Sequence, residues 1–78
     1  MVIDFSIGKI IATPHEVVIK LMGHNMAVLQ AQVDAVQLLG GGANVILAHS
    51  SEVKWSIKLD NETQLQEIAA AIGIDIAG

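Results

Sequence analysis

The chain has 78 residues, of which 53% are hydrophobic and 15% are charged, and it contains no cysteine. The absence of cysteine excludes disulfides and thiolate metal sites, and a formal net charge of −4 with only four basic residues argues against nucleic-acid binding. The longest apolar run, residues 68–74, is far shorter than the roughly 20 residues of a membrane-spanning helix. We therefore expect one domain over residues 1–78, in a cytoplasmic protein that has no contact with a membrane.

The first predicted elements are three strands. Ile3, Phe5 and Ile7 alternate with Val2, Asp4 and Ser6, which predicts a strand that begins near Val2, with a bulge or bend at Gly8. Residues 10–12 and 16–22 are rich in β-branched and apolar side chains, and the segment between them contains Pro14. This pattern predicts a hairpin whose second strand turns Val17, Ile19 and Leu21 inward.

The next segment has a helical period. Met26, Leu29, Val33 and Val36 recur at intervals of three to four residues, and Asn25 is a suitable N-cap. Glycines at 40–42 can adopt the left-handed conformation that ends a helix. A first helix is therefore predicted between residues 25 and 39.

The second half of the chain repeats this order. Residues 45–48 and 53–59 predict another hairpin, in which Val53, Trp55 and Ile57 face inward. Residues 61–72 follow with helical spacing, with Asp60 or Asn61 as the N-cap and Gly73 as the stop. Ile74 and Ile76 can form a short terminal strand.

An internal repeat supports this order. When the sequence is shifted by 36 positions, residues 10–39 align with residues 46–75. The identical pairs are Ile10/Ile46, Ala12/Ala48, Glu16/Glu52, Val17/Val53, Asn25/Asn61, Leu29/Leu65, Gln30/Gln66 and Ala35/Ala71. The predicted fold is α+β: a pseudo-duplicated ββα-ββα unit with a mainly antiparallel sheet of four to five strands and two helices on one face. A ferredoxin-like βαββαβ plait with an extra N-terminal strand is the alternative.

Two histidine–glutamate pairs are candidate metal ligands. His15 with Glu16, and His49 with Glu52, lie at or beside the two predicted hairpin turns. A pseudo-symmetric fold could bring these nitrogen and oxygen donors together. Polar residues at exposed turns also occur without any functional cause.

The outer face of the predicted sheet is a candidate interface. Val18 and Met22 lie on it beside Lys20, Lys54 and Lys58, so the face is half apolar. Lysines at such positions also keep an exposed sheet soluble. Because so small a chain has more apolar surface than its core can absorb, a contact between copies is expected here.

The sequence contains no recognisable catalytic or cofactor motif. The glycine triplet follows a predicted helix, whereas phosphate-binding loops precede one. We therefore expect a non-enzymatic protein-interaction module without a cofactor, which acts as a homo-oligomer and also binds another protein. The alternative is a regulatory domain that binds a small ligand or a metal through the hairpin histidines or a groove between the repeats.

Overall fold

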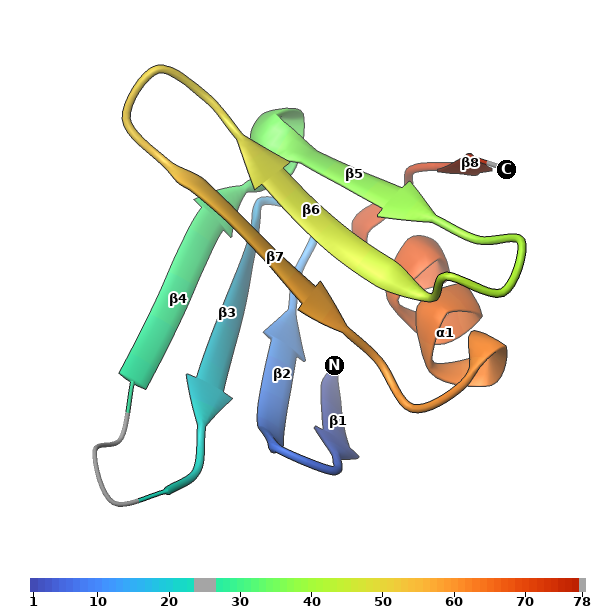
Figure 1. Cartoon of the computed structure of the whole chain (residues 1–78). Coiled ribbons are helices and arrows are strands. Elements are labelled where there is room, and N and C mark those ends of the chain that lie inside the picture. Colours follow the sequence, from blue (N-terminus) through green and yellow to red (C-terminus); the bar gives the residue numbers. More distant parts are fainter. Residues whose placement is uncertain (24–26, 78) are drawn as a thin grey trace.

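The computed structural model describes residues 1–23 and 27–77, which form two four-stranded sheets and a helix (Figure 1). The described residues contain eight strands, one short 3-10 helix (η1) and one α-helix. The bounds are β1 Val2–Phe5, β2 Gly8–Ala12, β3 Glu16–Leu21, β4 Ala27–Gln32, η1 Val33–Ala35, β5 Val36–Leu39, β6 Val45–His49, β7 Lys54–Lys58, α1 Glu62–Ile72 and β8 Ile76–Ala77.

The first sheet is a meander in which every strand pairs with its neighbour in the sequence, in the order β1-β2-β3-β4. All three pairings are antiparallel, and Ile10 lies opposite Ile3 on one side and Ile19 on the other. These three side chains are buried, whereas the residues between them point to the opposite face. The alternation of the sequence therefore sets which face of this sheet is inside.

The chain passes from the first sheet to the second at η1. Val33 begins this turn, and its N–H donates to the carbonyl oxygen of His15 at 3.0 Å. The second sheet has the order β7-β6-β5-β8, and the two-residue β8 pairs in parallel with β5. The Gly40 N–H donates to Ala77 O at 2.7 Å, which extends this contact past the end of β5.

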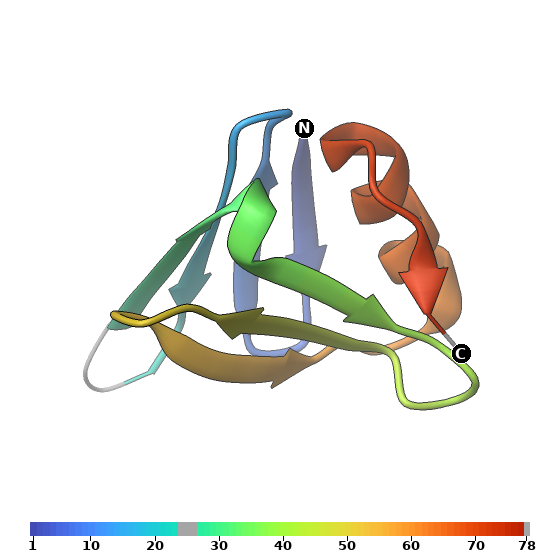
Figure 2. The same cartoon turned by 90° about the horizontal axis from the view of Figure 1, so that it is seen from above.

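The core lies between the two sheets and α1 (Figure 2). All three layers contribute fully buried side chains, and no described polar or charged residue is buried. The largest of these side chains are Ile10, Ile19, Leu38, Ile46, Leu65, Ile68 and Val17. Burial of apolar surface from all three layers holds the sheets and the helix together.

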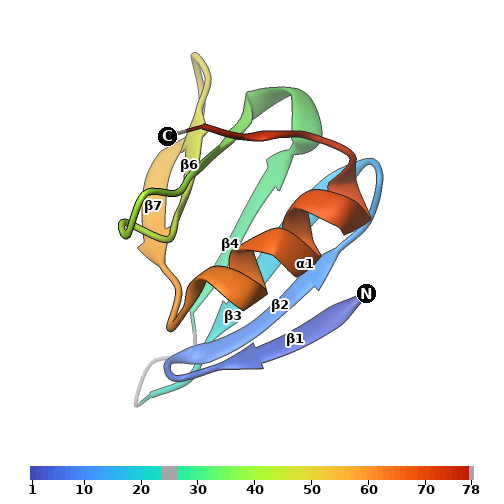
Figure 3. The same cartoon turned by 90° about the vertical axis from the view of Figure 1, so that its right-hand side faces the viewer.

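Helix α1 lies on the side of the molecule away from β4 and closes the core beside β1 and β2 (Figures 1 and 3). Its N-cap is Asn61, whose side-chain oxygen accepts from the Gln64 N–H at 2.9 Å, and Gly73 ends it with φ 75°. The Gln64 side-chain oxygen accepts from the Asp60 N–H, and the Gln64 Nε2 donates to the Asp4 carbonyl oxygen at 3.4 Å. These reciprocal bonds fix the helix start against the edge of β1.

The prediction of two helices on one face of a single sheet was wrong. The segment predicted as the first helix forms β4, η1 and β5, while the matching segment in the second half is α1. The two copies of the sequence repeat therefore have different structures in this part of the chain. The ferredoxin-like alternative, which needs the same first helix, was wrong for the same reason.

Other predicted elements are confirmed. The two hairpins are β2–β3 and β6–β7, and the N-terminal and C-terminal strands are β1 and β8. The glycines at 40–42 lie in the connection between β5 and β6 and do not end a helix. The predicted cap Asn25 lies outside the described residues.

Candidate functional site

Strand β4 is an edge of the first sheet, and the antiparallel register shows which of its backbone groups are free. Hydrogen-bonded pairs alternate along such a ladder, and Val33 bonds to His15. Ala31 and Leu29 therefore bond to β3, opposite Val17 and Ile19. The N–H and C=O groups of Val28, Gln30 and Gln32 point outward along the other side of β4. Every second residue in the described strand therefore directs its backbone groups away from β3.

Trp55 of β7 contacts this edge. Its indole Nε1 donates to the Gln30 carbonyl oxygen at 3.4 Å, across the gap between the two sheets. The distance is longer than usual for an N–H···O hydrogen bond. Within the described part of the chain, this is the hydrogen bond that joins the edge of β4 to β7.

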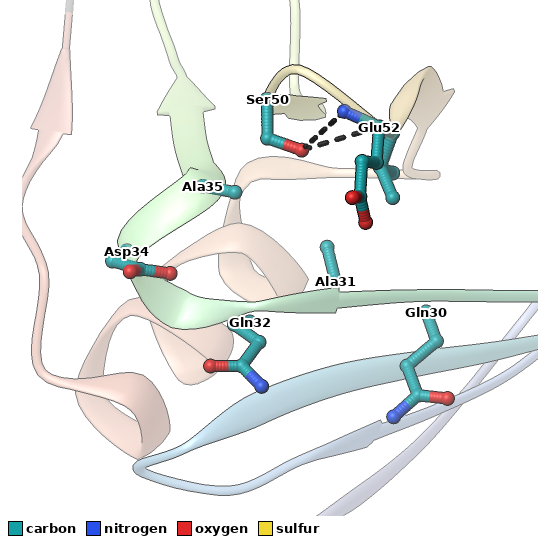
Figure 4. A pocket seen from close by; sticks show the side chains of 8 residues that line it. Gln30, Ala31, Gln32, Asp34, Ala35, Ser50 and Glu52 are labelled. Carbon is teal, nitrogen blue, oxygen red and sulfur yellow. Dashed lines mark hydrogen bonds between the residues drawn. The ribbon is translucent and has the colours of Figure 1, made fainter.

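A surface hollow of about 430 Å³ lies between the end of β4 and the turn that joins β6 to β7 (Figure 4). Ala31 and the Glu52 carboxylate point toward each other across it, whereas the side chains of Gln30 and Gln32 project from the other side of β4. The Ser50 hydroxyl shapes the turn, because it accepts from the N–H groups of Glu52 and Val53 at 3.3 and 3.1 Å. The lining residues are Gln30, Ala31, Gln32, Asp34, Ala35, Ser50, Glu52 and Val53.

The charge of the hollow has one sign. Asp34 and Glu52 are its charged lining residues, both exposed, and no lysine lines it. On the outer side of β4, Glu16 accepts from Gln30 Nε2 at 2.6 Å and so faces away from the hollow. A cationic side chain is therefore the charged group that best complements the hollow.

The four predicted metal ligands lie at two turns that both adjoin the β4–η1 corner. His15 and Glu16 are at the β2–β3 turn, while His49 ends β6 and Glu52 lines the hollow. The β2–β3 turn contacts the β4–η1 corner, because the His15 carbonyl accepts from the Val33 N–H. The β6–β7 turn lies across the hollow from the same corner. Over residues 1–23 and 27–77, however, no three histidine or acidic side chains are grouped closely enough to hold a metal ion.

The four interface candidates lie on two different sheets. Val18, Lys20 and Met22 point outward from β3 or just after it, and Met22 is 71% exposed. Lys54 begins β7 in the second sheet, so it does not share their face. The prediction placed all four on one sheet because it assumed that both hairpins belong to it.

The exposed large hydrophobic side chains collect on the first sheet. The five described residues of this kind are Met1, Val2, Ile7, Met22 and Val28. Each belongs to a strand of the first sheet or to a residue beside one, whereas the second sheet and α1 contribute none of the five. The exposed large hydrophobic side chains of the described residues therefore lie on the first sheet and at the ends of its strands.

Sequence reasoning missed the edge of β4 because it treated residues 25–39 as helical. Gln30, Gln32 and Asp34 then belong to the polar face of that helix. The signal available was the alternation of Val28, Gln30 and Gln32 with Leu29 and Ala31. A period of two over these residues is typical of a strand with one buried face.

The comparisons with known proteins identify the family. A family model described as a protein of unknown function (DUF3389) matches residues 1–76. The chain belongs to the DUF3389 family. No curated protein and no solved structure matches it.

In the part of this DUF3389 member that the structure describes, no helix is both long and apolar enough to cross a bilayer, and α1 has 11 residues. The cytoplasmic location expected from the sequence stays a prediction.

Proposed function

We propose that the chain is a protein-interaction module that self-associates through the outer face of the first sheet. The observation that carries this proposal is the gathering of the exposed large hydrophobic side chains on that sheet. A surface of this kind is typical of a contact with another protein. The partner that we propose is a second copy of the same chain.

The pattern of this face is complementary to itself. Val2, Ile11 and Val18 lie opposite one another and form an apolar row across β1, β2 and β3. On β3, Lys20 lies two residues to one side of Val18 and Glu16 two residues to the other. If a two-fold axis runs along the apolar row, Val18 faces Val18 of the second copy and Lys20 faces Glu16.

The ion pair across the axis would give the Lys20 ammonium group an acidic partner. Lys9 lies 3.9 Å from Asp4, but no acidic group within the described part of its own chain lies within ion-pair distance of Lys20. In the proposed dimer, Glu16 of each copy lies opposite Lys20 of the other copy, so the ion pair forms twice. Charge complementarity of this kind fixes the register of an interface more than it raises affinity.

The size of the face sets the expected strength. Four strands of about five residues cover about 17 Å by about 19 Å, or about 300 Å² in the plane of the sheet. A standard stable interface buries about 800 Å² on each partner. We therefore expect weak, reversible association with a dissociation constant on the order of 100 µM.

Sedimentation velocity from about 10 µM to about 1 mM tests the proposal. We expect a concentration-dependent shift from monomer to dimer, which Lys20→Glu and Glu16→Lys each abolish and the double substitution restores. Lys58→Glu, on the second sheet, makes the same charge change and serves as the matched control. A wild-type chain that stays monomeric throughout, or charge reversals with no more effect than the control, contradicts the proposal.

A further inference from the structure

A second surface of the molecule is the outward edge of β4, where, among the described residues, only the Gln30 carbonyl has a hydrogen-bond partner. We infer that the edge of β4 and the hollow beside it bind an extended segment of another protein by strand addition, with a lysine or arginine opposite Ala31. This site lies along the edge and inner side of β4, away from the outer face through which we propose self-association. Either proposal can therefore fail while the other holds.

The backbone of β4 is the first support. Val28, Gln30 and Gln32 direct their N–H and C=O groups outward, as the register with β3 requires. An added strand pairs with such groups at every second residue. Trp55 contacts one of them, the Gln30 carbonyl, through a long bond that leaves the second lone pair of this oxygen free.

The direction of the side chains is the second support. Residues directly opposite each other in neighbouring strands point to the same face of a sheet. Ala31 points into the hollow (Figure 4), so the residue opposite it on an added strand also points there. The two flanking residues of the added strand point to the outer side of β4, like Gln30 and Gln32.

The charge of the hollow selects that side chain. The acidic residues Asp34 and Glu52 line the hollow without any lysine, and the buried Ala31, across from the Glu52 carboxylate, contributes only a methyl group to this space. A long cationic side chain fills this space with its apolar stem and reaches the carboxylates with its charged end. The net charge of −4 also attracts a basic segment as it approaches.

Strand β7, an edge of the second sheet, does not supply this occupant. The Ser50 N–H donates to the Val53 carbonyl, and hydrogen-bonded pairs alternate along the ladder, so Trp55 and Ile57 bond to β6. The backbone N–H and C=O groups that point away from β6 therefore belong to Lys54, Ser56 and Lys58. If β7 of a second copy paired with β4, one of its inward apolar residues would lie opposite Ala31. Its lysines would lie on the other side of β4, away from the hollow.

Trp55 provides the measurement. It is the chain's only tryptophan, it is half-buried, and its indole contacts the Gln30 carbonyl at the proposed site. The probe is a peptide of about eight residues with blocked ends, alternating threonine and valine and one central lysine. Its partner peptide has glutamate in place of the lysine, and a third has N-methyl groups on the backbone amides that would face β4.

Titration of the full chain with each peptide, followed by Trp55 fluorescence and by calorimetry, tests the inference. We expect the lysine peptide to bind about tenfold more tightly than the glutamate peptide, and N-methylation to abolish binding. Equal binding of the lysine and glutamate peptides, unchanged binding after N-methylation, or no binding of the lysine peptide at about 1 mM overturns it.

Variants of the chain separate the two parts of the site. Gln30→Pro removes an outward N–H that β3 does not use, and we expect it to weaken binding about tenfold, whereas Gln30→Ala keeps that N–H and leaves binding within about twofold. Glu52→Gln should weaken the lysine peptide severalfold and Glu67→Gln, on the exposed side of α1, should not. Identical binding by the proline and alanine variants counts against strand addition. Identical binding by the two glutamine variants counts against a role of the acidic hollow. The N-methylated peptide gives the backbone test without any substitution, should Gln30→Pro fail to fold.

Discussion

Gly8 packs directly against the backbone of Lys20 in the neighbouring strand: a β carbon on Gly8 would lie 2.1 Å from the Lys20 carbonyl oxygen. No such distance is tolerated between these atoms, so any larger residue must push β2 and β3 apart. We expect Gly8→Ala to lower the free energy of unfolding by about 1–3 kcal/mol, as other overpacked sites do. Urea denaturation measures this, with Ser56→Ala at an exposed strand position as the control, and equal midpoints for the two variants would show that the strands can separate without cost.

The start of α1 makes the stability depend on pH. Hydrogen bonding with the Ser6 side chain is the largest cause that lowers the pKa of Asp60 below its ordinary value of 3.8, and bonds from the Ser6 N–H and from Gln64 act in the same direction, against a smaller effect of burial. Because the folded chain binds this proton less tightly than the unfolded chain, the carboxylate stabilises the fold above pH 3.8. This contribution is lost as the pH falls below that value through the lower pKa of the folded state.

Asp60→Asn removes the titrating group and tests this pH dependence. We expect the wild type to exceed the variant in urea midpoint near pH 7, and the difference to shrink as the pH falls below about 4. Glu67→Gln, at an exposed helix position, is the control for loss of one acidic charge. A difference that stays constant over this range would show that Asp60 does not act through its charge.

The N-cap of α1 gives a third prediction. Asn61→Ala removes the oxygen that accepts from the Gln64 N–H, and we expect a loss of about 1 kcal/mol in the free energy of unfolding. Asn61→Ser should recover most of it, because serine also caps helices well. Thermal unfolding followed by circular dichroism measures the change, with Thr63→Ala as the control; no recovery with serine would rule out capping as the cause.

Leu65 should anchor α1 to the sheets. It is fully buried among the residues of the core, so Leu65→Ala leaves a cavity and should cost about 2–5 kcal/mol. Gln66→Ala, at the next and exposed position of the same helix, should change the stability by less than about 0.5 kcal/mol. Chemical denaturation compares the two, and similar values would mean that the helix does not depend on this contact.

The alternation of apolar and polar residues was enough to predict both hairpins and their inward faces. Val17 and Ile19 are fully buried, and Trp55 and Ile57 are half-buried on the corresponding side of β7. The helix at residues 62–72 was also predictable, because Asn61 and Gly73 mark its ends with capping chemistry that depends on local sequence alone.

The first predicted helix failed for a reason that lies outside its own sequence. The inward residues of β4 and of β5 each recur at every second position, but the three residues of η1 interrupt this alternation. Leu29, Val33 and Val36 therefore have the spacing of a helix. Inward residues before the corner, such as Ala31, and after it, such as Val36, are then five positions apart. The pairing of β4 with β3 supplies the hydrogen bonds that decide between strand and helix, and tertiary pairing of this kind overrides local propensity.

The candidate site was only partly predictable for the same reason. Glu52 was singled out as a metal ligand and lines the hollow, but its neighbours there come from β4 and η1, which the sequence pattern placed on a helix. Val18 and Lys20 were predicted to share an outer face and do, whereas Lys54 belongs to the other sheet. A face within one hairpin follows from alternation, but a site between two hairpins depends on how the sheets are joined.

The meander of the first sheet also bears on how the chain folds. Strands β1 to β4 pair only with the strands next to them in the sequence, so their pairing closes short loops, whereas Gln64 contacts Asp4 across 60 residues of sequence. Closing short loops costs less chain entropy and is faster than joining distant segments. We therefore expect the four N-terminal strands to be ordered in the folding transition state, and α1 and β8 to dock after the rate-limiting step.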